Sequence, residues 1–364
     1  MRIGLVIYGL LDTVSGGYLY DRQLVSYLEA QGDQVEVVSI PWRNYSRHLL
    51  DNLSRDFYDR LLDLPIDILL QDELNHPSLF YLNRRIKGSI NYPIITIVHH
   101  LRCSESHPRW QMPVYTAVEK SYLKSVDGFI FNSQNTRQSV QDLVGADKNC
   151  VVAYPAGYRH KPDLTRETIE TRAHQEGPLQ ILFLGNVIPR KGLHILLEAL
   201  GKIVAKDWYL SVVGSLEIDL NYAQNIQQTV HGYGLANKVR FYGSLGEGQL
   251  NDVMLNSHIM VVPSYHEGFG IAYLEGMAFG LPAIGTTSGG ATEFITHDVN
   301  GYLVPRENAH LLAERIAGVI DDREVLTRMS WQAQERYLQH PTWETSMQRI
   351  RRFLEEEINQ EGVL

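Results

Sequence analysis

The chain contains few cysteines: Cys103 and Cys150 are the only two among 364 residues. Two thiols cannot form a disulfide framework in a chain of this length, and such scarcity is typical of a reducing compartment. Their separation also excludes a Cys-x-x-Cys redox or zinc motif. We therefore expect each cysteine to be a small packed residue.

Positive charge and long apolar runs are also lacking. The 33 Lys and Arg face 42 Asp and Glu, for a net charge of −9, which is unfavourable for nucleic-acid binding. No stretch reaches the ~20 apolar residues that span a membrane. The opening MRIGLVIYGLL stops at Asp12 without a cleavage site and is better explained as a strand than as a signal peptide. We expect a cytoplasmic protein, with peripheral contact at the inner face of the membrane left open.

What the chain does contain is an alternation of apolar, strand-like runs with helical patterns along its whole length. This alternation indicates parallel sheets joined by crossover helices, hence an α/β fold. The length suits two domains of about 150–180 residues. We interpret the polar stretch Arg159–Pro178 as the interdomain linker. The expected division is an N-terminal domain over 1–165, a C-terminal domain over 176–340 and a last helix over 341–364.

The segment Pro263–Glu293 is the most informative part of the sequence. It contains Glu267 and Glu275, with seven residues between them. The apolar run IMVV before it predicts a buried strand, and Ile271–Phe279 predicts a helix that stops near a glycine and a proline. The run PAIGTT predicts the next strand. The loop of such a strand–loop–helix–strand unit lies where an open α/β sheet binds ligands.

The spacing of the two glutamates limits their chemistry. If Glu267 lies at the start of the helix and Glu275 two turns in, they are roughly 12 Å apart. A glycosidase pair needs about 5–9.5 Å, so each glutamate should contact a different part of a long ligand, such as a nucleotide-sugar. Free N–H groups at the helix start suit a diphosphate and sugar hydroxyls. They belong to Gly268, Phe269, Gly270, Ile271 and Ala272. The alternative is that Glu267 only balances the helix dipole and Glu275 is solvated.

The residues EGFGIAYLEGMAFGLPAIG resemble the Glu-x7-Glu signature of the retaining glycosyltransferases of family 4, which have the GT-B fold. The pattern continues through GGATE and NGYLVP, and upstream through FYGSL and LFLGNVIPRKG. The resemblance implies two Rossmann-like domains facing across a cleft, with a C-terminal helix returning to the first domain. It also implies sugar transfer from a UDP- or GDP-linked donor to a glycan, lipid-linked or small-molecule hydroxyl. No metal or other cofactor is expected.

The resemblance also implies roles for three residues of the second domain. Glu267 would bind the sugar hydroxyls and stabilise positive charge that develops on the sugar. Glu275 would accept hydrogen bonds from the ribose hydroxyls, and Lys191 would stabilise the departing diphosphate. No carboxylate is placed by this pattern as a covalent nucleophile. Front-face attack, with the leaving phosphate taking the acceptor proton, is therefore the implied mechanism.

Four further donor contacts are expected in the second domain. Many family members have an arginine where this chain has Asn186, and Arg190 is a candidate to replace that phosphate contact. Gly243 and Ser244 lie where family members bind the base through backbone groups.

In the first domain the candidate residues follow predicted strands. A turn at Gly16-Gly17 lets the backbone approach a phosphate or sugar. Tyr20 stands where a dinucleotide-binding motif needs a third glycine, which disfavours a dehydrogenase. By resemblance, His99 contacts the donor sugar from across the cleft. His100 is the alternative, because a shift of one residue turns a side chain to the other face of a strand.

Weaker signals lie elsewhere in the first domain. Ser133 occupies a strand end that faces the cleft in family members. A metal site that includes His107 has no supporting carboxylate spacing. The aromatic and basic stretch Pro41–Leu50 is predicted as a solvated helix, since nearby aspartates cancel its charge, with acceptor contact as the alternative.

Two other functions remain open on the same fold. A nucleotide-sugar epimerase would turn over the donor without an acceptor. A catalytically idle nucleotide-sugar-binding subunit is the other, because Asn186 and the tract Ala156–Arg159 depart from the family pattern.

Overall fold

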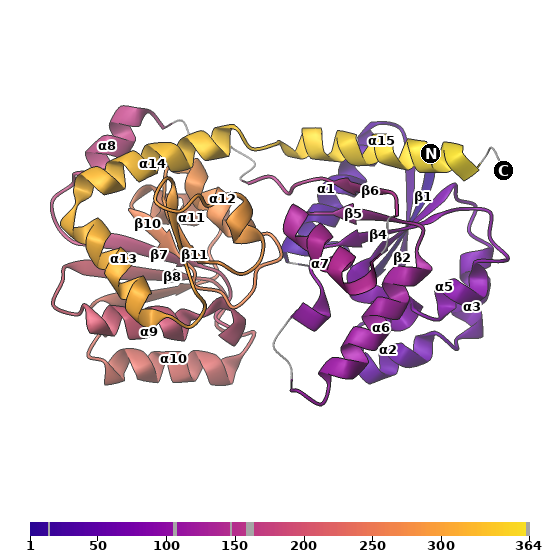
Figure 1. The fold of residues 1–364 in the computed structure, drawn as a ribbon, viewed down its shortest axis with the longest axis horizontal. Coiled ribbons are helices and arrows are strands. Elements are labelled where there is room, and N and C mark those ends of the chain that lie inside the picture. Colours follow the sequence, from indigo (N-terminus) through magenta and orange to yellow (C-terminus); the bar gives the residue numbers. More distant parts are fainter. Residues whose placement is uncertain (14, 105–107, 146–147, 158–163, 362–364) are drawn as a thin grey trace. The chain divides into compact units, whose positions relative to one another are not determined.

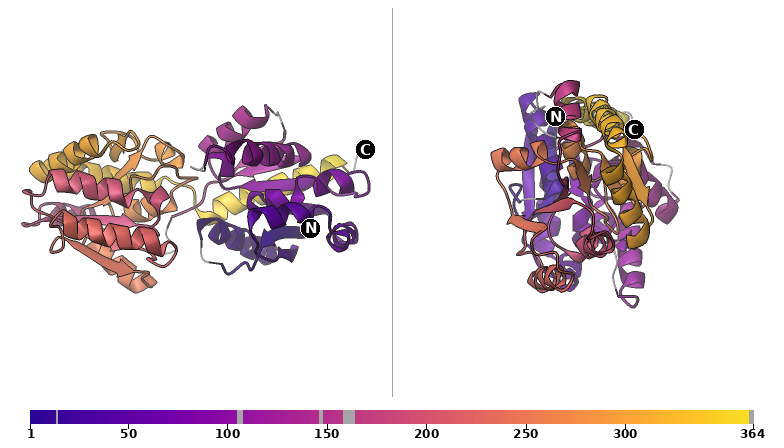
Figure 2. Two further views of the ribbon diagram at one scale, coloured as in Figure 1. Left: turned by 90° about the horizontal axis from the view of Figure 1, so that it is seen from below. Right: turned by 90° about the vertical axis from the view of Figure 1, so that its left-hand side faces the viewer.

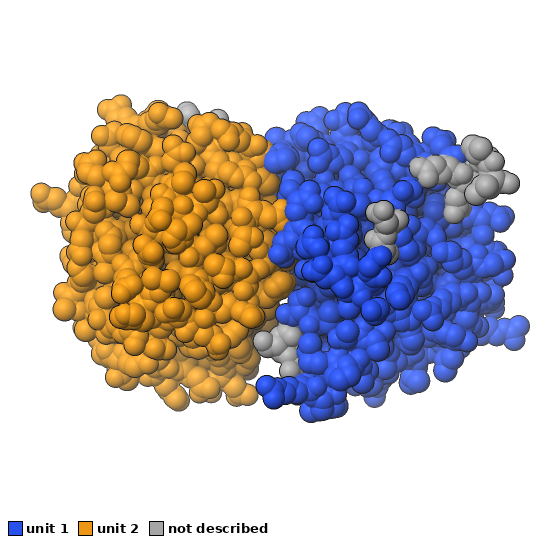
Figure 3. Space-filling model, viewed as in Figure 1, with its two compact units in different colours: residues 1–156, 341–364 blue, residues 157–340 orange. Residues whose placement is uncertain are grey.

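The protein is described by a computed structural model. The described residues are 1–13, 15–104, 108–145, 148–157 and 164–361. The candidate metal ligand His107, with Tyr158 and Arg159 of the divergent tract, lies outside them. The chain forms two compact units, residues 1–156 with 341–364 (unit 1) and residues 157–340 (unit 2), which Figure 3 shows in separate colours.

Unit 1 contains a parallel sheet with the strand order β2-β1-β3-β4-β5-β6 (Figure 1). Its strands are β1 (Arg2–Tyr8), β2 (Gln34–Ile40), β3 (Ile68–Asp72), β4 (Ile94–Val98), β5 (Gly128–Phe131) and β6 (Cys150–Val152). The opening apolar segment is therefore a strand. Ile3, Leu5 and Ile7 of β1 join one buried cluster, whereas Val6 and Tyr8 join another. This alternation buries both faces of the sheet.

Helices cover both faces of this sheet (Figures 1 and 2). The α-helices of unit 1 are α1 (Gly16–Ala30), α2 (Tyr45–Asp51), α3 (Arg55–Leu62), α4 (His76–Leu79), α5 (Leu82–Ile86), α6 (Met112–Ser125), α7 (Gln134–Val144) and α15 (Trp343–Glu361). Two 3-10 turns, η1 (Glu73–Asn75) and η2 (Arg102–Ser104), follow β3 and β4. Helix α15 packs on α1, and Arg351 Nε lies 2.7 Å from Asp33 Oδ2.

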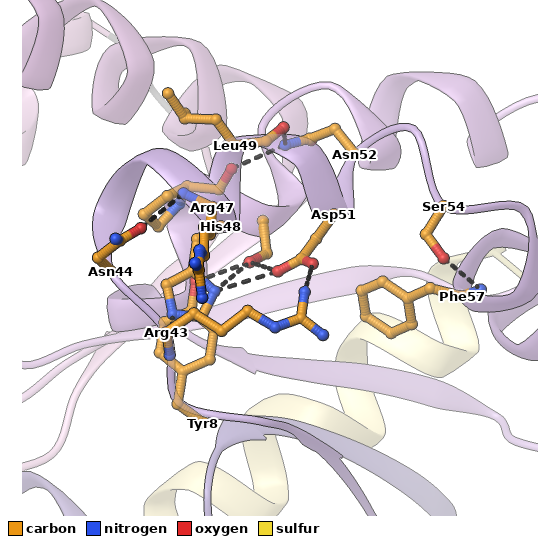
Figure 4. A network of polar contacts seen from close by, with 12 residues as sticks. Tyr8, Arg43, Asn44, Arg47, His48, Leu49, Asp51, Asn52, Ser54 and Phe57 are labelled. Carbon is orange, nitrogen blue, oxygen red and sulfur yellow. Dashed lines mark hydrogen bonds and ion pairs between the residues drawn. The ribbon is translucent and has the colours of Figure 1, made fainter.

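The stretch Pro41–Leu50 is mostly exposed, as expected of a solvated segment, and its helix is α2. The inner face of α2 is buried, however, with His48 3% exposed and the following Asp51 7% exposed. Ser78 Oγ donates to Asp51 Oδ2 at 2.7 Å and lies 2.7 Å from the Tyr8 hydroxyl. Arg43 donates to the other Asp51 oxygen at 2.5 Å (Figure 4). The acid that was expected to balance surface charge instead belongs to this internal network.

Unit 2 repeats the same plan with the strand order β12-β11-β10-β7-β8-β9, all parallel. Its strands are β7 (Leu179–Leu184), β8 (Trp208–Val213), β9 (Val239–Gly243), β10 (Ile259–Val261), β11 (Ala283–Thr286) and β12 (Gly301–Val304). Its helices are α8 (Arg166–Ala173), α9 (Leu193–Lys202), α10 (Leu220–Gly232), α11 (Glu247–Leu255), α12 (Ile271–Ala278), α13 (Ala309–Asp321) and α14 (Arg323–Leu338), with 3-10 turns η3 (Pro189–Lys191) and η4 (Gly290–Glu293). The expectation of two Rossmann-like parallel-sheet domains is confirmed.

The interpretation of Arg159–Pro178 as an interdomain linker needs a correction. It carries helix α8, which packs on α14 as part of unit 2. Ile169 is buried, and Arg172 donates to the Phe279 carbonyl at 2.7 Å. Only two residues of α8 are buried. The other residues are mostly polar, which explains why the sequence of this packed helix resembles that of a linker. Among the described residues, no helix is both long and apolar enough to cross a membrane.

Candidate active site

The candidate site of unit 2 lies where the order of the strands in the sheet reverses. Strand β7 has β8 and β9 on one side and β10, β11 and β12 on the other. In open α/β sheets, ligands bind outside the carboxyl ends of the strands at such a switch point. The loops that follow β7 and β10 leave the sheet at this point, and they carry Lys191 and Glu267.

A glycine brings these two loops into contact. Gly192 has φ +71°, and a Cβ at this position would lie 2.2 Å from the Pro263 carbonyl oxygen. Only glycine fits this close approach at a positive φ. The preceding Lys191 then donates from Nζ to Glu267 Oε1 at 2.6 Å. The sequence pattern that ends in Arg-Lys-Gly thus places a cation directly on the first glutamate of the pair.

Glu267 is buried, with 6% of the residue exposed. Ser264 Oγ also donates to Oε1 at 2.6 Å, and Arg190 Nη1 lies 3.7 Å from Oε2. Burial alone would raise the pKa of Glu267, but the charges of Lys191 and Arg190, with the hydrogen bonds, lower it to about 2. The carboxylate is therefore negative at neutral pH and fixed in orientation.

The turn at Gly289-Gly290 packs against the backbone of the loop that carries Glu267. Gly289 has φ +87°, and a Cβ there would lie 2.1 Å from the Glu267 carbonyl oxygen. The next residue, Gly290, donates its N–H to that oxygen at 2.9 Å. This contact explains why the segment closes with two glycines: the second loop lies directly against the backbone of the catalytic candidate.

Helix α12 begins at Ile271, as predicted, after Gly270 at φ +92°. Glu267 therefore lies four residues before the helix instead of at its start, and Glu275 lies about one turn in rather than two. The separation of roughly 12 Å assumed eight helical residues and does not apply. Among the described residues, the N–H groups of Ile271 and Ala272 have no backbone acceptor. Burial raises the pKa of Glu275 to about 7, with an opposing effect from the charge of Lys191.

The remaining predicted donor contacts lie at the same edge of the sheet. Asn186 is exposed after β7, and its Oδ1 accepts from Ser215 N at 3.3 Å. Arg190 donates to the His266 carbonyl at 2.8 Å, in addition to its approach to Glu267. Gly243 ends β9 at φ +68°, followed by the exposed Ser244. Their contacts with a donor remain predictions.

In unit 1, His99 follows β4 and lies against helix α1. Gly17 leaves room for the ring, since a Cβ there would lie 3.1 Å from His99 Cδ2. Asp21 Oδ1 is 3.3 Å from His99 Nε2. The preceding Gly16 is the exposed first residue of α1, whose N-cap is Ser15. The glycine turn therefore serves at least to seat the histidine.

The surroundings of His99 are acidic. Burial lowers its pKa, but the hydrogen bond and charge of Asp21 and the charges of Asp72 and Glu73 outweigh this and raise it to about 9. Burial raises the pKa of Asp72 to about 6, the charge of Asp21 adds to the rise, and His99 opposes it. His99 is therefore an imidazolium at neutral pH.

Two carboxylate–histidine clusters have atoms close enough to share a metal ion. In the first, Asp21, Asp72 and His99 offer donor atoms that all lie within 4.8 Å of one another. The same spacing holds in the second, formed by Glu73, His76 and Glu119. Hydrogen bonds use some of these atoms: His99 Nε2 lies 3.3 Å from Asp21 Oδ1, and Glu119 accepts from two backbone N–H groups at 2.6 and 3.0 Å. Each cluster is therefore at least in part a hydrogen-bonded network.

The acceptor-side candidates have different surroundings. Ser133 is fully buried and caps α7, accepting from Thr136 N at 2.9 Å. Its neighbour Asn132 donates to the His99 carbonyl at 2.8 Å. His100 is half-buried, and its charge lowers the pKa of the Asp72 carboxyl. The roles of Ser133 and His100 toward an acceptor remain predictions.

Three site residues were missed by the sequence reasoning. Asp21 is an acid on the apolar face of α1, four residues after Gly17. A charged residue at such a position is the sequence feature that could have identified it as a site residue. Asp72 ends a strand, where ligand-facing residues are expected. Ser264 carries no signal of its own, because its partner is decided by the folding of the loop.

Two parallel α/β units with cations and carboxylates at the carboxyl edges of their strands have the architecture of GT-B proteins. Two family models match the chain: Glycosyltransferase Family 4 over residues 16–157 and Glycosyl transferases group 1 over 165–336. The chain belongs to the glycosyltransferases of the family 4 type.

Individual relatives agree with this assignment. The D-inositol 3-phosphate glycosyltransferase of Geodermatophilus obscurus is 28% identical over 223 residues, covering 57% of this chain and 49% of the relative. The chain spans about half the length of the curated relatives it matches. Sucrose-phosphate synthase from Thermosynechococcus elongatus has a similar fold, with a TM-score of 0.80 at 19% identity over 99% of both chains. Anabaena HepE, solved in complex with UDP-glucose, gives 0.75 at 19% identity over 98% of this chain and 100% of its own.

Proposed function

We propose that the chain is a retaining glycosyltransferase that moves a sugar from a nucleotide diphosphate-sugar to a hydroxyl acceptor. The observation that carries this proposal is the contact of Lys191 with Glu267 at the switch point of unit 2, beside the start of α12. A cation and helix N–H groups suit a diphosphate, and a fixed carboxylate suits sugar hydroxyls. One ligand that contains both groups is a nucleotide-sugar.

The donor roles follow from the charges. Lys191 and Arg190 bind the diphosphate and stabilise the negative charge that grows on it as the glycosidic bond breaks. Glu267 accepts hydrogen bonds from the sugar and stabilises the positive charge on its ring. Glu275 binds the ribose diol. His99, as an imidazolium, donates to the sugar or to a phosphate oxygen.

The stereochemical course is proposed from the state of Glu267. Its carboxylate already accepts from Lys191 and Ser264, so its negative charge is partly compensated and it is a poor nucleophile. We therefore propose front-face attack by the acceptor hydroxyl: its oxygen bonds to the anomeric carbon as the bond to the diphosphate breaks. The hydroxyl proton passes to the departing phosphate oxygen. This scheme uses no metal ion and no further cofactor.

The donor and the acceptor are proposed by class. A UDP-sugar is the first candidate donor, because HepE was solved with UDP-glucose, and GDP-sugars are the second. The acceptor is a glycan, a lipid-linked sugar or a small-molecule alcohol, as in glycan, glycolipid or exopolysaccharide assembly. A cytoplasmic location, with contact at the inner face of a membrane, completes the proposal.

The test is turnover of a panel of UDP- and GDP-sugars, followed by release of the nucleoside diphosphate and by NMR of the sugar. The transferase should hydrolyse one donor slowly alone and faster with an acceptor, giving a product with the donor's anomeric configuration. Conversion of the donor to an epimer without acceptor would replace the proposal with an isomerase. Binding of the donor without any turnover would replace it with an idle nucleotide-sugar-binding subunit.

A further inference from the structure

Asp21 is a buried acid that the proposed transfer does not yet use. It lies on the inner face of α1, and its side chain is 0% exposed. Its Oδ1 faces His99 Nε2 at 3.3 Å. Its Oδ2 has no hydrogen-bond partner among the described residues. A buried carboxylate with an unsatisfied oxygen is costly, which calls for an explanation beyond packing.

The ring of His99 is fixed on several sides. One edge of the imidazole ring lies against Gly17, where the absence of a Cβ leaves room for it. Tyr20 contacts the ring edge-to-face, with the ring centroids 5.3 Å apart. Asn132 Nδ2 donates to the His99 carbonyl at 2.8 Å, which fixes the backbone. Nδ1 makes no hydrogen bond to any described residue, and the His99 side chain is 14% exposed. Because Nε2 is turned to the buried carboxylate, Nδ1 is the nitrogen left for a ligand.

We propose that Asp21 is a positioning residue for His99: it accepts the Nε2–H, fixes the ring and leaves an Nδ1–H that donates to a substrate oxygen. The consequence for catalysis rests on the proposed function. The orientation of the ring does not, because it follows from contacts within unit 1 alone.

The charge of the ring decides whether Nδ1 donates. A neutral imidazole carries one proton, and with that proton on Nε2 its Nδ1 is an acceptor. Only the imidazolium donates from both nitrogens. The acidic groups that act on His99 are Asp21 on α1, Asp72 at the end of β3 and Glu73 on η1, while the neighbouring His100 acts on Asp72. Burial lowers the pKa of His99, but the hydrogen bond to Asp21 and the three negative charges raise it to about 9. Nδ1 therefore donates at neutral pH and becomes an acceptor above pH 9.

The first experiment reads the ring directly, by NMR of the full chain labelled with ¹⁵N-histidine. His99→Gln identifies the signal. The expected result is titration near pH 9 and, above it, ¹⁵N shifts of the Nε2–H tautomer. A pKa near 6.5, or a proton on Nδ1 above pH 9, would overturn the proposal. This reading needs no variant at Asp21 and no substrate.

Two variants distinguish the effect of a carboxylate beside His99 from the effect of the overall charge of the protein. Asp21→Asn should lower the pKa of His99 by at least about one unit. Asp12→Asn removes the same charge from an exposed position and should leave it unchanged. Equal effects of the two variants would overturn the proposal. So would a change of the His99 signal in the native protein on adding EDTA, because the cluster would then hold a cation.

Kinetics test the consequence separately. Asp21→Asn should lower kcat about 10- to 100-fold with little change in KM, and the pH at which activity is lost should move below that of the native enzyme. An unchanged pH profile would refute the role in turnover. If no donor is turned over by the native protein while the NMR results hold, the proposed function fails and the positioning role stands.

Discussion

The contact of Lys191 with Glu267 makes a quantitative prediction about stability. The pKa of Glu267 is about 2 in the folded state, against 4.5 for the free side chain. A depression of 2.5 units corresponds to about 3 kcal/mol of folding free energy, because one unit is worth ~1.4 kcal/mol. The pKa is lowered, so this contribution is present above pH 4.5 and is lost as the pH falls toward 2. The Glu267 side chain taken alone is 8% exposed, which limits screening by solvent.

Replacing Lys191 by methionine removes the principal compensating charge and leaves a buried carboxylate. We expect a loss of about 2–4 kcal/mol at pH 7, since breaking a buried pair costs about 3–5 kcal/mol and Arg190 and Ser264 remain. In a unit of 184 residues (157 to 340) this corresponds to a decrease in Tm of roughly 5–15 °C. Lys202→Met is the matched control, because Lys202 pairs with Glu198 at the surface and should cost less than about 0.5 kcal/mol.

A double-mutant cycle in urea unfolding isolates the pair. Lys191→Met with Glu267→Gln should recover most of the lost stability, since no uncompensated charge remains, giving a coupling of about 2–3 kcal/mol. Additive single substitutions, with a coupling below about 0.5 kcal/mol, would show that the contact contributes nothing and would refute the reasoning.

Two further predictions concern the same unit. The affinity for the nucleotide should rise with pH through about 7, where Glu275 loses its proton and gains an acceptor for the ribose diol; titration calorimetry from pH 6 to 8.5 measures this, and Glu275→Gln should abolish the dependence. A pH-dependence that persists in Glu275→Gln would assign it to another group. Gly289→Ala should destabilise by at least about 2 kcal/mol and inactivate, because its Cβ would meet the Glu267 carbonyl at a positive φ. Gly232→Ala, which meets no atom within 4 Å, should be nearly neutral in the same thermal melts.

Much of the fold could be predicted because its signals are local. Apolar runs of strand length separated by helical periods define a parallel α/β plan residue by residue. The strand predicted from PAIGTT is β11 (Ala283–Thr286) in the structure. Helix α8 was missed because it buries only Ile169 and Ala173, too few to produce a period.

The candidate site was predictable to the extent that one segment carries it. The loop and helix around Glu267 are contiguous, and the cation Lys191 has a recognisable pattern. Partners from distant segments were not predictable from spacing: Asp21 meets His99 across 78 residues, and Asp51 meets Ser78 across 27. The assumed helical path between the two glutamates does not hold, for a local reason. Gly270 in the left-handed region immediately precedes α12, and the residues from Glu267 to Gly270 are not helical.

The central claim is that unit 2 binds a nucleoside diphosphate through Glu275 and the cations at the switch point. Thermal melts with UDP, GDP, ADP, CMP and NAD test it most directly, on the native chain, on Glu275→Ala and on Glu314→Ala, an exposed control. A ligand at 100 times its Kd stabilises by about 2.7 kcal/mol, or roughly 5–10 °C for a unit of this size. One nucleoside diphosphate should raise the Tm of the native chain and the control, and Glu275→Ala should lose most of that shift. A response to NAD alone, or an equal shift in Glu275→Ala, would contradict the account.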